Sequence, residues 1–107
     1  MDECAVLYAT GDIIIDEPDP HSFFAPSRSL LAGGDFVLGQ IEVPHTLRGE
    51  ANSTDIPAPP ADPANLDALV PCGFNLCTTA GNHAHDNGVP GIVDTIAHLK
   101  ERGIAVT

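Results

Sequence analysis

The sequence predicts one α/β domain with a mainly parallel sheet and flanking helices. Two observations predict this fold class. Short apolar segments alternate with helix-like segments along the 107 residues, and such alternation is typical of parallel strands joined by right-handed crossovers. Hydrophobic residues make up 43% of the chain, which is enough for one core in a domain of this size.

The first half of the chain contains two expected strands. Ala5–Ala9 and Ile13–Ile15 are apolar runs separated by Thr-Gly-Asp, which predicts a buried strand that opens into a loop at its carboxyl end. A short helix is expected at about 26–31, stopped by two glycines. The segment 36–43 then predicts a second strand, which Pro44 closes.

The next segment is polar and rich in proline. Residues 45–63 include "STDIPAPPADP", which is typical of an irregular surface loop. A helix is expected after it, with Asp62 as N-cap, Pro63 in the first turn, and an apolar face made by Leu66, Leu69 and Val70.

The last third predicts a strand, a helix and the start of a fourth strand. "FNLCTTA" is the expected strand, and "IAVT" begins the fourth. Between them, "VPGIVDTIAHLKERG" has Ile92, Ile96 and Leu99 on one helical face and Gly103 at its end.

The overall charge excludes some classes of partner. Fifteen acidic against four basic residues give a net charge of -11, which disfavours binding to nucleic acid or to an anionic membrane surface. Clustered carboxylates can attract divalent cations, although most of these residues are expected to serve solubility. We see no signal peptide or membrane-spanning run in the chain, so the cytoplasm is the expected compartment.

The three cysteines predict neither a disulfide framework nor a zinc ribbon. Cys4, Cys72 and Cys77 are odd in number and lack a CxxC spacing. We expect them to be small buried residues. A thiol enzyme is disfavoured because Cys72 and Cys77 lie in or beside apolar segments, where a thiolate is destabilised.

Four residues with metal-binding side chains follow the expected strands. Asp12, Glu42, Asn82 and His83 combine carboxylate, amide and imidazole groups, a mixture that a divalent ion accepts. Ligands of open α/β sheets bind beyond the carboxyl ends of the strands, where these residues are expected. Each also has a structural interpretation, as a turn residue, a cap, or a strand residue that faces water.

Two further residues of the same loop are candidates for proton transfer. His85 is interpreted as a general acid or as a solvent-facing turn residue, and Asp86 as a catalytic group or as the cap of the following helix. Asp94 and Thr95 are expected to support this loop through hydrogen bonds. No partner is predicted for His45 or for the two remaining histidines.

Three blocks of the sequence resemble a known family. "GDIII", "DFVLGQIEVPHT" and "GFNLCTTAGNHAHDNGVPGIVDTIAHLKERGIAV" are similar to the amino-terminal part of the CapA (poly-γ-glutamate capsule synthesis) family. That family is related to the calcineurin-like metallophosphoesterases, so the resemblance implies about half of an α/β/β/α sandwich. The third block is the most specific of the three.

The resemblance implies roles for individual residues. Asp12, Glu42, Asn82 and His83 fall on positions that would line a metal centre, and Asp86 on the family's Asp. The pattern has Asn where this chain has Gln40 and Asn where it has Gly81. A histidine found in the phosphoesterases is replaced by Ile14. The remaining ligands are expected in a C-terminal half, so residues 1–107 are expected to be one partial domain.

Two functional hypotheses follow from the resemblance and from the expected incompleteness. The first is a CapA-like capsule or poly-γ-glutamate biosynthesis protein with a metal-dependent, phosphoesterase-like hydrolase site. It would hold Mn, Zn or Fe and act on an anionic polymer, a phosphoester or a γ-glutamyl substrate. The second is a non-catalytic acidic module that binds divalent cations weakly, or that depends on a complementing chain or an oligomer.

Overall fold

A parallel four-stranded sheet forms the centre of the molecule. The computed structural model describes residues 3–51 and 58–107, and the strands lie in the order β1-β2-β3-β4 with every pair parallel. This confirms the α/β fold class, whereas the wider sandwich stays a prediction. The elements in chain order are β1 (Leu7–Ile13), the 3-10 helix η1 (Pro20–Phe24), α1 (Arg28–Leu31), β2 (Phe36–Ile41), the 3-10 helix η2 (Pro63–Cys72), β3 (Leu76–Thr78), α2 (Gly88–Glu101) and β4 (Ala105–Val106).

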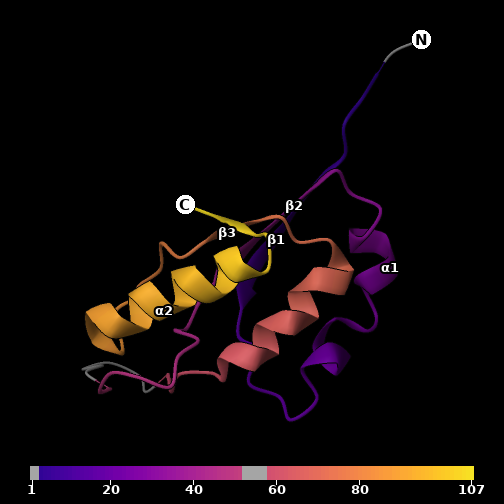
Figure 1. The fold of residues 1–107 in the computed structure, drawn as a ribbon. Helices are drawn as coiled ribbons and strands as arrows, with labels where there is room; N and C mark the ends of the chain where they lie inside the picture. Colours follow the sequence, from indigo (N-terminus) through magenta and orange to yellow (C-terminus); the bar gives the residue numbers. More distant parts are fainter. Residues whose placement is uncertain (1–2, 52–57) are drawn as a thin grey trace.

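The helices form one layer on the sheet. Helix η2 packs against η1, α1 and α2, so the helices form a single packed layer (Figure 1). Alternate residues of β2 point into this layer: Val37 and Ile41 are buried, whereas Phe36 is 55% exposed. The core between the layers consists of Ile13, Ile15, Phe24, Leu31, Val37, Ile41, Leu66, Ala68, Leu69, Cys72, Phe74, Cys77, Leu99 and Ile104.

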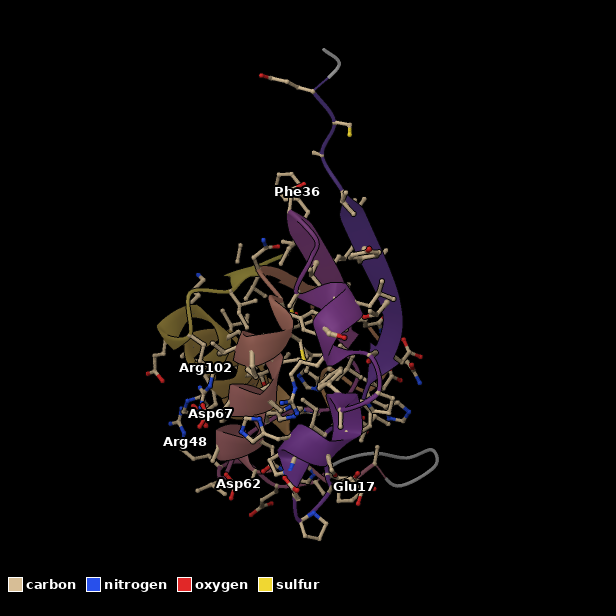
Figure 2. All side chains as sticks on the ribbon, turned by 90° about the vertical axis from the view of Figure 1, so that its right-hand side faces the viewer. Glu17, Phe36, Arg48, Asp62, Asp67 and Arg102 are labelled. Carbon is tan, nitrogen blue, oxygen red and sulfur yellow. The ribbon has the colours of Figure 1, made fainter. Side chains whose placement is uncertain are left out.

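The opposite face of the sheet is open among the described residues. Leu7 is 62% exposed and lies beside Phe36 in the register of β1 and β2. Figure 2 shows Phe36 at the beginning of β2, beyond the helices. This open face is therefore apolar near the amino ends of these strands.

The first strand differs from the expectation. The segment Thr10-Gly11-Asp12 does not form a loop after a strand but continues β1 to Ile13. The register between β1 and β2 shifts between Ala9 and Asp12, so the polar residues are accommodated by a bulge. Strand β2 ends at Ile41, two residues before the predicted end.

The helices were predicted with mixed accuracy. Asp62 accepts a hydrogen bond from the Ala64 N–H at 2.8 Å and caps η2 as expected. That helix is of the 3-10 type, and Val70 lies on its exposed side rather than on its apolar face. Gly103, with φ of 75°, follows the end of α2 as predicted. The N-cap of α2 is Asn87, so the prediction that Asp86 caps this helix is wrong.

Residues 45–51 and 58–62 of the proline-rich segment form no strand or helix apart from an isolated β-bridge between His45 and Ala61, Pro63 begins η2, and residues 52–57 lie outside the described residues. Across residues 3–51 and 58–107, no helix combines the length and the apolar composition that crossing a bilayer demands.

Leu69 tests whether η2 holds the core together. Its side chain is fully buried, so we expect Leu69→Ala to lower the free energy of unfolding by about 2–5 kcal/mol through lost burial and a residual cavity. Leu47 is 83% exposed, and Leu47→Ala is the matched control, with an expected change within about 0.5 kcal/mol. Urea unfolding followed by circular dichroism measures both. Equal costs for the two variants would contradict this packing.

Candidate functional site

The carboxyl ends of three strands meet at one edge of the sheet. Asp12 of β1 is paired with Gln40 of β2, which is paired in turn with Thr78 of β3. These residues are therefore level with one another, and the segments that follow them begin side by side. The parallel register thus places Asp12 at the edge of the sheet from which the segments with Glu42 and His83 leave β2 and β3.

Glu42, His83 and Asp86 form a line of three titratable side chains at this edge. His83 Nδ1 lies 2.7 Å from Asp86 Oδ2, a hydrogen-bond distance. An ionised carboxylate only accepts hydrogen bonds, so Nδ1 carries the proton and donates it to Asp86. In the neutral ring Nε2 then keeps its lone pair, and it faces Glu42 Oε1 at 3.9 Å. Both facing side chains are largely enclosed, at 16% and 12% exposure.

The spacing of Glu42 and His83 fits two ligands of one metal ion. A distance of 3.9 Å is too long for a hydrogen bond. Two ligands that each lie about 2.0–2.2 Å from a zinc ion are ~3–4 Å apart. A histidine that binds a metal usually donates its other N–H to a carboxylate, as His83 does to Asp86. The donor set of imidazole and carboxylate suits zinc, manganese or iron.

Gln40 holds the other side of Glu42. Its Nε2 donates a hydrogen bond to Glu42 Oε2 at 3.0 Å, while Glu42 Oε1 faces the histidine. A Cβ atom at Gly81 would lie 2.5 Å from this Nε2 and 3.4 Å from Glu42 Oε2. A side chain at position 81 would therefore displace the amide of Gln40, which occupies this space. The two departures from the CapA-like pattern, Gln40 and Gly81, are in direct contact.

The other predicted residues are less closely gathered. Asp12, Asn82 and His85 are exposed, and Asp86 is buried at 7% exposure. Within residues 3–51 and 58–107, no group of three or more His, Cys, Asp or Glu side chains is arranged to hold a metal ion. The structure thus brings together one pair of candidate ligands with its supporting groups, and the ligand roles of Asp12 and Asn82 stay predictions.

A salt bridge joins the segment after β2 to helix α2. Thr46 Oγ1 donates to Asp94 Oδ2 at 2.6 Å, and Arg48 Nε donates to the same oxygen at 2.9 Å, with a second guanidinium nitrogen on Asp94 Oδ1. The hydrogen bonds from Arg48 and Thr46 hold the pKa of the Asp94 carboxyl well below its usual range. We call these three residues the Asp94 clasp.

Close backbone packing reinforces the Asp94 clasp. The His45 N–H donates to Thr95 Oγ1 at 2.9 Å, so Thr95, like Asp94, holds the segment after β2 rather than the loop of His83 and His85 that the sequence suggested. Gly49 has φ of 80°, and a Cβ atom there would lie 2.2 Å from the carbonyl oxygen of Asn87. A side chain at position 49 would therefore separate the segment from the start of α2.

His45 is buried between the segment after β2 and the helices, a position that the sequence did not predict. Its Nδ1 lies 3.0 Å from the Val43 carbonyl oxygen, so Nδ1 carries a proton, and Nε2 is buried without a hydrogen-bond partner among the described residues. Burial lowers the pKa of His45 to about 4, and the positive charge of Arg102 acts in the same direction. A lone histidine between Pro44 and Thr46 carried no pattern that could have indicated burial.

A cavity of about 270 Å³ adjoins Glu42 and His83. Asp16, which the sequence reading did not single out, lines it together with apolar residues. The signal that could have found Asp16 is its place directly after the apolar run of the first strand. The full lining is Ile14, Asp16, Glu42, Val43, Ala58, Pro59 and His83.

The buried cysteines do not contribute to this site. Cys72 and Cys77 are fully buried in the core as predicted, whereas Cys4 is exposed, so the prediction of burial is wrong for Cys4. Burial raises the pKa of the Cys77 thiol to about 11 and raises that of Cys72 as well. A thiol with such a pKa is protonated and weakly nucleophilic at neutral pH.

The sequence matches one protein family over almost its whole length. The family is described as bacterial capsule synthesis protein PGA_cap, and the match covers residues 6–107. No curated protein matches the chain. The matched range includes Glu42, His83 and the three residues of the Asp94 clasp.

The contact between Gly81 and Gln40 gives a testable coupling. We expect Gly81→Ala to displace the Gln40 amide from Glu42 and to cost about 1–2 kcal/mol, because the hydrogen bond to a charged group is lost. In a Gln40→Ala background the same change should cost almost nothing. The control is Gly11→Ala, since a Cβ there meets no atom within 4 Å. Urea midpoints measure all variants, and an equal cost in both backgrounds would refute the coupling.

Burial of neutral His45 predicts a pH-dependent stability. Between the unfolded pKa of about 6.5 and the folded pKa of about 4, the unfolded chain binds more protons, so stability falls as the pH is lowered through this window. The loss should approach about 2–3 kcal/mol and be absent above this window. His45→Asn should remove it, since Asn retains the donor to Val43 but does not titrate. His21→Asn, at an exposed position, should retain it. Unfolding curves from pH 4 to 7.5 provide the comparison.

Proposed function

The chain belongs to the bacterial capsule synthesis protein family PGA_cap, and we propose that it holds a divalent metal in a hydrolase-type site. The observation that carries the proposal is the line from Glu42 through His83 to Asp86. In it a carboxylate and an imidazole nitrogen face each other at 3.9 Å, and a second carboxylate orients the ring. Such an arrangement supports metal binding because the ligand atoms are held in place before the ion arrives.

Each residue of the site has a defined task in this proposal. Glu42 Oε1 and His83 Nε2 bind the metal, Asp86 is a positioning residue that fixes the histidine tautomer, and Gln40 positions Glu42. When bound, a divalent ion lowers the pKa of a coordinated water and polarises the bond to be broken. Asp12 and Asn82 are proposed to complete the coordination from β1 and from the residue before His83.

His85 is proposed to carry the proton-transfer role. It is exposed in the same turn as His83, so it can exchange protons with solvent. Asp86 is less suited to that role because it is buried and already accepts a hydrogen bond from His83. A general acid near the edge of the sheet would protonate the leaving group as the bond breaks.

The proposed substrates follow from the family rather than from the site. A capsule synthesis protein acts on polymer or precursor chains, and the CapA-like motifs suggest a phosphoester or a γ-glutamyl amide of an anionic polymer. Four basic residues in the whole chain offer little charge to hold such a polymer. A bound metal would therefore be the main source of positive charge near the bond that reacts.

A second candidate function is a non-catalytic module that binds cations weakly. The observation that favours it is that the described residues supply a single pair of facing ligands, where a stable zinc site needs three or four. In this candidate the remaining ligands come from another chain, or the pair binds an ion that stays largely hydrated.

Calorimetric titration of Mn²⁺ and of Zn²⁺ into the protein tests the proposal. We expect saturable binding with one ion per chain, weakened at least about tenfold by His83→Ala or Glu42→Gln, since each removes a ligand, and by Asp86→Asn, since it releases the ring. The matched control is His98→Ala. His98 forms the same kind of pair with a carboxylate three residues on, Glu101 at 3.2 Å, but it lies on helix α2 and is partly exposed.

The outcomes separate the two candidates. Binding that is lost with His83 and retained with the His98 variant supports the metal site, and hydrolysis of phosphoesters and γ-glutamyl amides is then assayed with the loaded protein. Binding that is unaffected by either substitution contradicts the site. Weak binding that becomes tight only at high protein concentration supports ligands from a second chain.

A further inference from the structure

The cavity beside Glu42 has two carboxylates and an otherwise mainly apolar wall. Asp16 and Glu42 contribute the carboxylates, and Ile14, Val43, Ala58 and Pro59 contribute apolar surface. Its volume of about 270 Å³ is close to the lower end of small-molecule pockets, roughly 300 Å³. The cavity thus has room for one small organic group with a polar end.

Among residues 3–51 and 58–107, no Lys or Arg side chain lines this cavity, and the one basic side chain of its lining is the imidazole of His83. The chain has four Lys and Arg residues. Arg48 is paired with Asp94, and Arg102 donates to Asp67 at 2.7 Å. In Figure 2 both arginines lie on the opposite side of the view from Glu17, the neighbour of Asp16. Arg28 donates to the His21 carbonyl oxygen in the first helical segment, and Lys100 is exposed on α2.

Asp16 is exposed at the cavity, and no cationic side chain pairs with it among residues 3–51 and 58–107. Glu42 is committed to Gln40 through one oxygen and faces His83 with the other. A ligand that enters the cavity therefore meets Asp16 as an exposed carboxylate that forms no ion pair with a described residue, with Glu42 Oε1 as a second acceptor. An anionic group there would face both carboxylates without a compensating cation.

We propose that this cavity binds an organic ammonium group carried on a short apolar stem. The ammonium has three donors and no acceptor, which suits carboxylate oxygens, and the stem removes the apolar wall from water. The charge-assisted hydrogen bond to Asp16 sets the orientation of the group. The chemical class includes alkyl amines and the amine-bearing ends of larger molecules.

This inference goes beyond the proposed hydrolase and does not require the metal. Asp16 and the apolar wall are present whether or not Glu42 and His83 hold an ion. If they do, the Glu42 carboxylate binds the ion, and Asp16 is the carboxylate that binds the ammonium group. An ammonium group bound in the cavity would then lie beside the bond that reacts. The anionic parts of a polymer substrate would lie outside the cavity.

Titration with four small probes, followed by two-dimensional NMR of the ¹⁵N-labelled protein, tests the inference. Butylammonium and butyrate share a stem and differ in charge, whereas methylammonium lacks most of the stem and sodium chloride controls for ionic strength. We expect butylammonium to shift the amide signals of Ile14, Val43 and Ala58 with an affinity at least about tenfold above that of butyrate. Methylammonium should bind several-fold more weakly than butylammonium, since about three methylene groups are lost.

Asp16→Asn should reduce the butylammonium affinity at least about fivefold, since it removes the charge and retains the size of the side chain. Asp19→Asn is the matched control, because Asp19 is also exposed and does not line the cavity. Unchanged NMR spectra elsewhere establish that the variants fold.

Three results would overturn the inference: equal binding of butyrate, equal binding of methylammonium, or an Asp16 variant that binds like wild type. Repeating the titration with Zn²⁺ present separates it from the proposed function. Ammonium binding without metal binding would contradict the proposed metal site and support the ammonium site. Metal binding without ammonium binding would contradict the ammonium site and support the metal site.

Discussion

The contacts between the segment after β2 and helix α2, namely the Asp94 clasp and the hydrogen bond from the His45 N–H to Thr95, join the two segments on which the candidate site depends. Glu42 directly follows β2, and the chain then passes through the buried His45 to the Asp94 clasp on α2. His83 and Asp86 lie in the turn that leads into the same helix. Contacts within the fold, rather than attraction between Glu42 and His83 alone, therefore place these two side chains 3.9 Å apart.

The distribution of charge separates this edge of the sheet from the rest of the surface. Arg48 and Arg102 are paired with Asp94 and Asp67, away from the cavity, whereas Asp16 and Glu42 line it. An edge with this charge attracts cations of either kind, metal or ammonium. The same charge would repel an anionic substrate unless a bound cation neutralised part of it. The low content of Lys and Arg is thus a property of the site as well as of the surface.

Much of the fold could be predicted from the sequence, because hydrophobic periodicity and caps are local signals. The strand of Phe36, the cap at Asp62 and the stop at Gly103 are of this kind. The continuation of β1 through Thr-Gly-Asp could not be predicted, since a bulge depends on pairing with β2. Asp86 fits the composition of a helix cap, but it accepts a hydrogen bond from His83, three residues earlier in the same turn, and the N-cap is Asn87. This local arrangement depends on the turn conformation, which composition does not specify. The burial of His45 could not be predicted because it depends on packing against segments distant in the sequence.

The exchange at positions 40 and 81 shows why motif comparison alone misjudges this site. Counted position by position, Gln40 and Gly81 are two departures from the pattern of the family. In the structure they are one change, because the longer amide of Gln40 fills the space that a side chain at position 81 would take. The hydrogen bond from that amide keeps Glu42 turned toward His83. The facing pair of Glu42 and His83 is therefore held by supporting groups that differ from those of the CapA-like pattern, and the two differences compensate each other.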